Sequence, residues 1–266
     1  MPTLYAMPTE RFQRPPVAVF TLVRAPSELP LGTAARARVR VLEVRLDRFA
    51  PSDWKGIVRE AGASFPQARL LATLRFQKDG GAWPNDASRA EALAETFSLR
   101  EWDYLDLEWD AFDFDEITPL LSKHSAWTRL VCSRHDFVPP SEGVSQALAA
   151  LWNAATIRHA AVAKWAGTLA DPEQEIMELC TFAALHGDEG IVPSLFAMGS
   201  AAQVTRVASA LLSGGWSYGH DGVGEAAPGQ LPWSTLDALL QSLPQPQAFT
   251  RSWLDAVAGA IRMTQD

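Results

Sequence analysis

The sequence contains only two cysteines among its 266 residues, Cys132 and Cys180. Two cysteines are too few for a disulfide framework, and both lie in apolar segments, so we expect reduced, buried thiols. The sequence also has no apolar stretch of the roughly 20 residues that a membrane-spanning helix needs. Residues 1–16 lack the apolar core of a signal peptide. These absences favour a cytoplasmic globular protein without a membrane partner.

Positive charge is scarce as well. The chain has 23 basic and 31 acidic residues and a formal net charge of −8. This balance argues against a general nucleic-acid surface, which needs clustered positive charge. It is still compatible with an anionic small molecule, because a few arginines inside a pocket can oppose the overall sign. The histidines show no metal-ligand spacing, so we predict no metal site.

The chain is instead rich in short apolar runs that alternate with helical patterns. Hydrophobic residues make up 47% of the chain, enough to bury a sizeable core. Eight runs have the composition of strands: 17–23, 39–46, 70–76, 104–109, 130–135, 160–165, 191–198 and, more weakly, 215–219. Helical spacing or composition marks 87–97, 143–157, 173–185, 201–212 and 233–243.

This alternation predicts one α/β domain. Parallel neighbouring strands need crossover connections, and eight strand–helix units fit a closed (β/α)8 TIM barrel better than an open sheet. We therefore expect a single barrel domain over residues 1–266, with 1–16 as an N-terminal extension and 246–266 carrying a C-terminal helix. Pro26, Pro30 and Gly32 interrupt the segment between the first two strands, so we expect an irregular first crossover.

Polar side chains recur near the carboxyl ends of the predicted strands. Side chains alternate along a strand, so Glu43 shares a face with Arg45, as Ser133 does with His135. One such strand alone favours a solvent-facing antiparallel sheet. Four of them favour an active site at the carboxyl mouth of a barrel. There Glu43 and Arg45 would hold a polar ligand and each other, although a surface pair is the alternative.

Lys164 and His135 suggest the chemistry of this site. Lys164 is flanked by alanine, valine and tryptophan, and burial disfavours the charged ammonium form, which leaves a neutral amine as a nucleophile. His135 lies one strand earlier and could move protons. Together they suggest carbonyl chemistry through a Schiff base. A lone histidine at a strand end is more often structural, and Arg75 could equally face a loop. Glu108 could lie on the surface, although a supporting role in the site is favoured.

Seven short segments, in one order along the chain, resemble type I 3-dehydroquinate dehydratase between about residues 17 and 243. The family has a (β/α)8 fold. The segments are Leu42-Glu43-Val44-Arg45-Leu46-Asp47, Thr73-Leu74-Arg75, Asp106-Leu107-Glu108, Ser133-Arg134-His135-Asp136-Phe137, Lys164, Met198 through Arg206, and Ala227-Pro228-Gly229-Gln230.

The resemblance implies that 3-dehydroquinate loses water to give 3-dehydroshikimate without a metal or nucleotide cofactor. Lys164 would form the imine, and His135 would move the proton and assist the departing hydroxyl. Arg206 would pair with the substrate carboxylate. The other substrate-binding residues would be Glu43, Arg45, Arg75, Gln230, Met198, Phe196 and Thr21, with Asp79 and Glu108 in supporting roles. The family is often dimeric, which implies a homodimer here.

Several positions depart from the family pattern. Asp79 stands where the family often has a glutamate that orients the histidine, and a shorter carboxylate reaches less far. Phe196 replaces a methionine, Thr205 replaces a serine, and Ala226 replaces a serine of the closing loop. These changes affect rate and substrate choice more than reaction class. Whether the enzyme serves biosynthesis or quinate catabolism stays open, because both use this reaction.

Two other functions remain compatible with the sequence. The first is a different Schiff-base barrel, such as an aldolase for a phosphorylated sugar, which would need a glycine-rich phosphate nest around Gly214, Gly215 and Gly219. The second is a barrel that binds a related hydroxy acid without turnover. Retention of both His135 and Lys164 argues against this second alternative.

Overall fold

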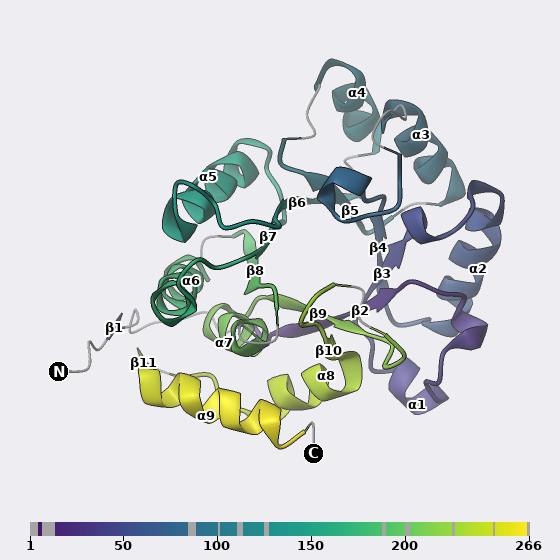
Figure 1. The fold of residues 1–266 in the computed structure, drawn as a ribbon. Coiled ribbons are helices and arrows are strands. Elements are labelled where there is room, and N and C mark those ends of the chain that lie inside the picture. The colour runs from purple at the N-terminus through teal and green to yellow at the C-terminus, as the bar shows by residue number, and fades with distance from the viewer. Residues whose placement is uncertain are drawn as a thin grey trace.

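Eight parallel strands curl into a barrel in the computed structural model (Figure 1), as the sequence predicts. The structure describes residues 5–6, 14–84, 89–100, 102–110, 114–124, 128–187, 190–199, 203–224, 227–246 and 248–264. The barrel strands are β2 (Val17–Leu22), β3 (Val41–Arg45), β4 (Arg69–Thr73), β5 (Tyr104–Glu108), β6 (Arg129–Asp136), β7 (Val162–Gly167), β8 (Val192–Ala197) and β9 (Trp216–His220).

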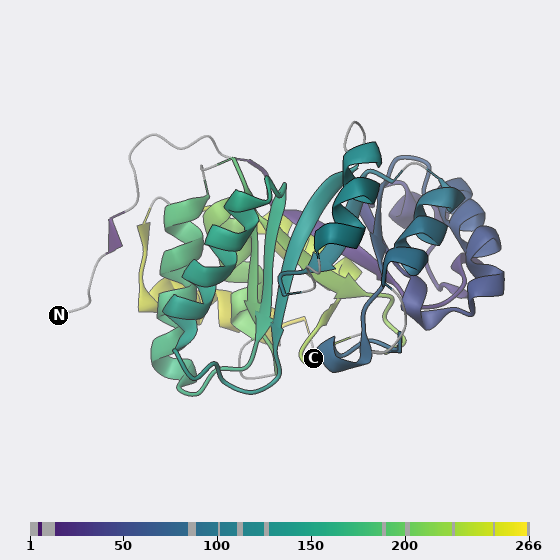
Figure 2. The ribbon, with the colours of Figure 1, turned by 90° about the horizontal axis from the view of Figure 1, so that it is seen from above.

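Helices connect the strands and cover the outside of the barrel, lying alongside the strands in the turned view of Figure 2. The first crossover is irregular, as expected, with the short η1 (Pro26–Glu28) and α1 (Thr33–Arg36). The others are α2 (Trp54–Ser64), α3 (Arg89–Leu99), α4 (Phe114–His124), α5 (Val144–Ile157), α6 (Pro172–His186), α7 (Gln203–Ser213) and α8 (Trp233–Ser242), with α9 (Arg251–Arg262) following. Single 3-10 turns occur at η2 (Leu46–Arg48), η3 (Pro51–Asp53) and η4 (Gln77–Asp79).

Two of these helices, α2 and α4, were not predicted. Gly56 and Gly62 lie inside α2, and Pro119 lies inside α4. Such residues weaken the local helical propensity, so these helices depend more on packing against the barrel than on composition. Buried Trp54 and Val58 supply that packing for α2. The start of α6 has a clear local signal. Asp171 accepts hydrogen bonds from backbone amides of the first turn, and Pro172 occupies the first helical position.

The interior of the barrel consists of an apolar layer below a polar layer. Side chains two residues apart on a strand point to the same side, so each strand contributes an inward-facing residue to both layers. The apolar layer lies toward the amino ends of the strands and contains Val19, Val41, Leu71, Tyr104, Val131, Val162 and Trp216. Two residues further along each strand the buried side chains are Thr21, Glu43, Thr73, Asp106, Ser133, Lys164 and Tyr218. The larger apolar core, which includes both free cysteines, lies between strands and helices.

The hydrogen-bonded ladder has one seam, between β8 and β9. Among the described residues the sheet runs in the order β10-β9-β2-β3-β4-β5-β6-β7-β8, so β8 and β9 do not pair directly. The Ser194 hydroxyl donates across the seam to the Trp216 carbonyl at 3.1 Å. Toward the carboxyl end, the short β10 (Leu231–Pro232) pairs with β9. Gly219 permits this approach, because a Cβ there would lie 2.5 Å from the Trp233 Cα.

A segment near the N-terminus pairs outside the barrel with the segment that precedes the last helix. The strand β1 (Tyr5–Ala6) pairs antiparallel with β11 (Ala248–Phe249), just before α9 (Figure 1). Most of the expected 1–16 extension lies outside the described residues. The C-terminal helix begins at Arg251, where Thr250 caps its first turn. In the described part of the chain, every helix is too short or too polar to cross a bilayer.

Candidate active site

A cavity opens at the carboxyl ends of the barrel strands and brings together most of the site residues predicted from the sequence. Both catalytic candidates, Lys164 and His135, line it. Glu108 does not line the cavity and is buried beside it. The lining comprises Thr21, Glu43, Arg45, Arg75, Asp79, Gly80, His135, Phe137, Lys164, Ala166, Phe196, Met198, Arg206, Tyr218, Ala227, Pro228 and Gln230.

Lys164 extends from β7 into the barrel and is 6% exposed, so its expected burial is confirmed. The expectation of apolar surroundings is wrong. Lys164 Nζ donates to Asp106 Oδ2 at 3.0 Å and lies 3.4 Å from Glu43 Oε1. Nζ also lies 4.0 Å from the centroid of the Tyr218 ring, a cation–π distance. These carboxylates and the ring fix the position of a nitrogen that water barely reaches.

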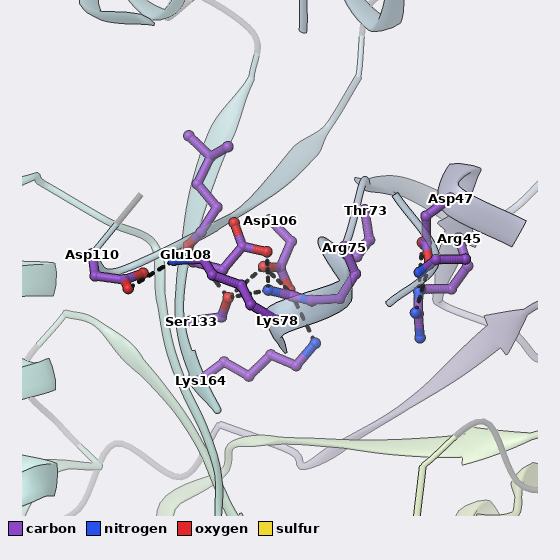
Figure 3. A network of polar contacts seen from close by, with 12 residues as sticks. Arg45, Asp47, Thr73, Arg75, Lys78, Asp106, Glu108, Asp110, Ser133 and Lys164 are labelled. Atoms are coloured by element: carbon purple, nitrogen blue, oxygen red, sulfur yellow. Dashed lines mark hydrogen bonds and ion pairs between the residues drawn. The ribbon is translucent and has the colours of Figure 1, made fainter. Parts of the chain in front are cut away.

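Asp106 connects Lys164 to a buried ionic network (Figure 3). Arg75 lies 2.6 Å from Asp106 Oδ1 and donates to Glu108 at 2.7 Å and to the Ser133 hydroxyl at 2.9 Å. Burial alone would raise the pKa of Asp106, but Arg75 and Lys164 hold it well below its ordinary value. Burial opposes the charge of Arg75, yet Asp106 and Glu108 raise its pKa further above the ordinary value. Both groups therefore stay charged.

Glu43 is held at the floor of the cavity by two threonine hydroxyls. Thr21 donates to Glu43 Oε2 and Thr73 donates to Glu43 Oε1, each at 2.9 Å. Gln230, which directly precedes β10, donates to the Thr21 hydroxyl at 3.3 Å. The loop before β10 is therefore linked to β2 and β3 through one short chain of hydrogen bonds.

The expected pairing of Glu43 with Arg45 is wrong. Arg45 instead donates two hydrogen bonds of 2.9 Å to the two carboxylate oxygens of Asp47 (Figure 3). Arg45 and Asp47 are two residues apart, at the turn from β3 into η2, and a planar guanidinium fits both oxygens of one carboxylate. The Ala82 amide also donates to Asp47, which fixes this pair at the rim of the cavity.

His135 and Asp79 each keep a buried polar atom without a hydrogen-bond partner in the described structure. These atoms are His135 Nδ1 and Asp79 Oδ2. Burial lowers the pKa of His135 well below its ordinary value, and the positive charges of Arg75 and Lys164 lower it further. The imidazole is therefore neutral and can accept a proton. Burial, with the nearby Glu108 charge, raises the pKa of Asp79 to about 6.

The shifted carboxyl of Asp79 predicts a pH-dependent effect of Asp79→Asn on stability. Below about pH 4 the carboxyl is protonated in both folded and unfolded chains. Between about pH 4 and pH 6 the unfolded chain loses the proton first, so wild type loses stability as pH rises. We expect the melting temperature of Asp79→Asn, relative to wild type, to be higher near pH 7 than near pH 4. The matched control is Asp53→Asn on the exposed η3, and an equal difference at both pH values would contradict the prediction.

Arg206 is the buried cation at the other side of the cavity. It comes from α7, is 1% exposed and donates to the Pro228 carbonyl at 3.0 Å. Its guanidinium lies 4.4 Å from the centroid of the Phe196 ring. The preceding Thr205 hydroxyl accepts from the Ala197 amide at 2.9 Å, which ties the first turns of α7 to the end of β8. Met198 is the first residue after β8, and its side chain adds an apolar wall to the cavity.

Two residues of the site were missed in the sequence. Asp106 contacts both Lys164 and Arg75, although only Glu108 was singled out on that strand. The signal was available, because Asp106 and Glu108 share one face of β5. Tyr218 carries no charge and lies in the weakest predicted strand, so nothing distinguished it from a core aromatic residue. Ala226, expected in the closing loop, lies outside the described residues.

The glycines weighed as a phosphate nest do not form one. Gly214 and Gly215 precede β9 and therefore lie at the amino end of the barrel, away from the cavity. Backbone fills the space beside both, because a Cβ added to Gly214 would lie 2.2 Å from the Arg14 carbonyl oxygen and one added to Gly215 would lie 2.0 Å from that of Pro193. Gly219 faces the backbone of Trp233. Among the described residues, no group of three or more histidine, cysteine, aspartate or glutamate side chains is placed to hold a metal ion.

Comparison with known proteins gives a consistent result. A family model described as type I 3-dehydroquinase matches residues 24–246. A 3-dehydroquinate dehydratase of Pyrobaculum aerophilum is 31% identical over 234 residues, covering 83% of this chain and 67% of that protein. A 3-dehydroquinate dehydratase of Methanopyrus kandleri is 31% identical over 208 residues, covering 76% of this chain and 86% of that protein. The crystal structure of a 3-dehydroquinate dehydratase from Geobacillus kaustophilus shares the fold, with a TM-score of 0.69 and 21% identity over 90% of this chain and 96% of that one.

Proposed function

Because the chain belongs to the type I 3-dehydroquinase family, we propose that it is a hydro-lyase that converts 3-dehydroquinate to 3-dehydroshikimate through an imine on Lys164. This reaction places the enzyme in the shikimate pathway. One observation carries the proposal: a buried lysine amine and a neutral imidazole line one cavity that also contains buried guanidinium groups. An amine and a base beside an anion-binding arginine are what imine-based elimination from a keto acid requires.

The reaction begins at Lys164. Its nitrogen attacks the ketone carbon, and the C=O electron pair moves to oxygen. Two of the three ammonium protons end on that oxygen, which leaves as water, and the nitrogen keeps one proton in a protonated imine. The imine draws electrons, so the proton on the adjacent carbon becomes acidic. Asp106 and Glu43 hold the nitrogen in position before attack, through their contacts of 3.0 Å and 3.4 Å.

His135 moves the proton. Its neutral imidazole accepts the proton from the carbon next to the imine, and the C–H electron pair forms an enamine. The enamine then expels the hydroxyl group, which takes the proton back from His135 and leaves as water. A carbon–carbon double bond remains, and hydrolysis of the imine releases the product and restores the Lys164 amine. The reaction requires neither a metal nor a nucleotide cofactor.

The remaining lining residues bind and enclose the substrate. Arg206 pairs with the carboxylate, and Phe196 and Met198 form apolar walls beside it. Glu43, Thr21 and Gln230 form the polar floor that receives ring hydroxyls, and Arg45 lies at the rim. Arg75 and Glu108 support the site through Asp106, and Asp79 lies near the base. These roles explain why so many charged groups are buried at one end of the barrel.

Arg206→Ala should mainly raise KM for 3-dehydroquinate. Loss of one member of a buried charge pair costs about 2–5 kcal/mol, or roughly 30-fold to several thousand-fold in affinity. Steady-state kinetics against the substrate concentration measure this change. Arg251→Ala, an exposed arginine on α9, is the matched control. An unchanged KM in a folded Arg206→Ala variant would show that another group binds the carboxylate.

Borohydride trapping tests the proposed function. Borohydride reduces an imine to a stable amine, so wild-type protein treated with 3-dehydroquinate and borohydride should carry a mass adduct that peptide mapping places on Lys164. Without borohydride, the conjugated product should appear by its ultraviolet absorption. Folded protein with intact substrate that gives neither adduct nor product would reject the proposal. An adduct without product would indicate a different Schiff-base enzyme.

We also propose a cytoplasmic homodimer, following the resemblance to the family. Sedimentation would distinguish the 29.0 kDa chain from a species of twice that mass. A monomer at micromolar concentration would contradict the dimer without affecting the proposed reaction, because every residue invoked above comes from one chain.

A further inference from the structure

Tyr218 has a hydroxyl group that is left unpaired in the middle of the site. The residue lies on β9, points into the barrel and is 3% exposed. Its hydroxyl is buried and has no hydrogen-bond partner within the described part of the chain. Its ring lies 4.0 Å from Lys164 Nζ and lines the cavity. Phenylalanine would supply the same ring, so packing does not explain the hydroxyl.

An unpaired buried hydroxyl destabilises a folded protein, and such groups call for a functional explanation. The group is also a fixed donor. Burial raises the pKa of Tyr218 well above its ordinary value, and the nearby carboxylates of Glu43 and Asp106 raise it further. The phenol therefore keeps its proton throughout the working pH range. The same two carboxylates are those that Lys164 binds.

Imine formation changes the number of donors on Lys164. An ammonium group has three N–H bonds, and two of them serve Asp106 Oδ2 and Glu43 Oε1 in the free protein. A protonated imine has one N–H bond. Glu43 Oε1 keeps the Thr73 hydroxyl, and Asp106 Oδ1 keeps Ser133 and Arg75. Asp106 Oδ2 takes its hydrogen bond from Lys164, so the covalent intermediate leaves this carboxylate pair one donor short.

We propose that Tyr218 is a positioning residue whose hydroxyl donates to the Glu43–Asp106 carboxylate pair once Lys164 is bound as the imine. The hydroxyl is unpaired in the free protein and becomes paired in the intermediate, so it stabilises the intermediate over the free state. The proposal rests on the proposed function, because it requires an imine at Lys164.

Tyr218→Phe tests this role, because it removes the hydroxyl and keeps the ring. At saturating 3-dehydroquinate we expect borohydride to trap the Lys164 adduct about tenfold more slowly than in wild type, which corresponds to about 1.4 kcal/mol. We expect kcat/KM to fall by a similar factor. The melting temperature of the free variant should be equal to or higher than that of wild type, since the unpaired group is gone.

The matched control is Tyr104→Phe. Tyr104 also points into the barrel, but at its amino end, where its hydroxyl accepts from Arg69 at 3.2 Å. Trapping and turnover should be unchanged in this variant. Wild-type trapping and turnover in Tyr218→Phe would overturn the role of Tyr218 alone, and so would losses accompanied by a lower melting temperature. A wild-type protein that forms no adduct would overturn both the role of Tyr218 and the proposed function.

Discussion

Lys164→Ala should abolish both the borohydride adduct and turnover, lowering kcat by about 10⁴-fold or more, because the nucleophile itself is gone. Another lysine of the chain should not take over this role, because the nucleophilic amine must lie inside the cavity and close to a group that transfers protons. Mass spectrometry of the trapped protein and a continuous absorbance assay measure the two losses.

Two controls separate chemistry from folding in Lys164→Ala. The variant removes the cation between Glu43 and Asp106, but Thr73 and Arg75 still bind these carboxylates. Circular dichroism should therefore show a folded barrel. Lys55→Ala, an exposed lysine on α2, should trap and turn over as wild type. An adduct of undiminished yield in Lys164→Ala, mapped to a different lysine, would contradict the proposed nucleophile.

His135→Ala should separate the two halves of the reaction. Imine formation needs the Lys164 amine, whereas removal of the carbon-bound proton needs a base, so the variant should keep some borohydride adduct. Turnover should fall on the order of 10²–10⁴-fold, the usual contribution of a positioned acid–base group. Single-turnover trapping and steady-state assays on the same preparation measure both quantities.

His124→Ala is the matched control for His135→Ala. His124 ends α4 and stacks on Phe97 outside the barrel, 4.1 Å between ring centroids. Its replacement should leave turnover unchanged. If His135→Ala retained most of its turnover, the proton would have to move through another group, and the assignment of the base would be wrong.

The fold was predictable because seven of the eight strands carry a clear local pattern, and only 215–219 is weak. Polar groups near the carboxyl ends of several strands indicated a barrel mouth, and this mouth holds the cavity. The helices α2 and α4 were missed, since glycine and proline weaken their local signal and tertiary packing determines them. The seam between β8 and β9 also escaped prediction, because closure of a sheet depends on contacts between residues distant in sequence.

The sequence predicted most residues of the site but not which of them bind one another. Sequence alternation placed Glu43 and Arg45 on one face, yet it could not show that Asp47 offers Arg45 two oxygens at the turn that follows. Lys164 was expected among apolar neighbours because its sequence neighbours are apolar. The groups that contact its amine come from β3, β5 and β9, and the pattern around Lys164 itself does not reveal them. Tyr218 was missed because it is uncharged and lies in the weakest predicted strand.

The seam has a consequence for engineering. Phe196 lies on β8 and Tyr218 on β9, so two neighbouring rings of the cavity wall belong to strands that share no backbone ladder. Their ring centroids are 6.0 Å apart. Ser194 contributes a side-chain hydrogen bond across the seam, and it also lies beside Lys164 in the register of β7 and β8. Substitutions at Ser194 should therefore alter the spacing of the two rings and the position of the lysine together.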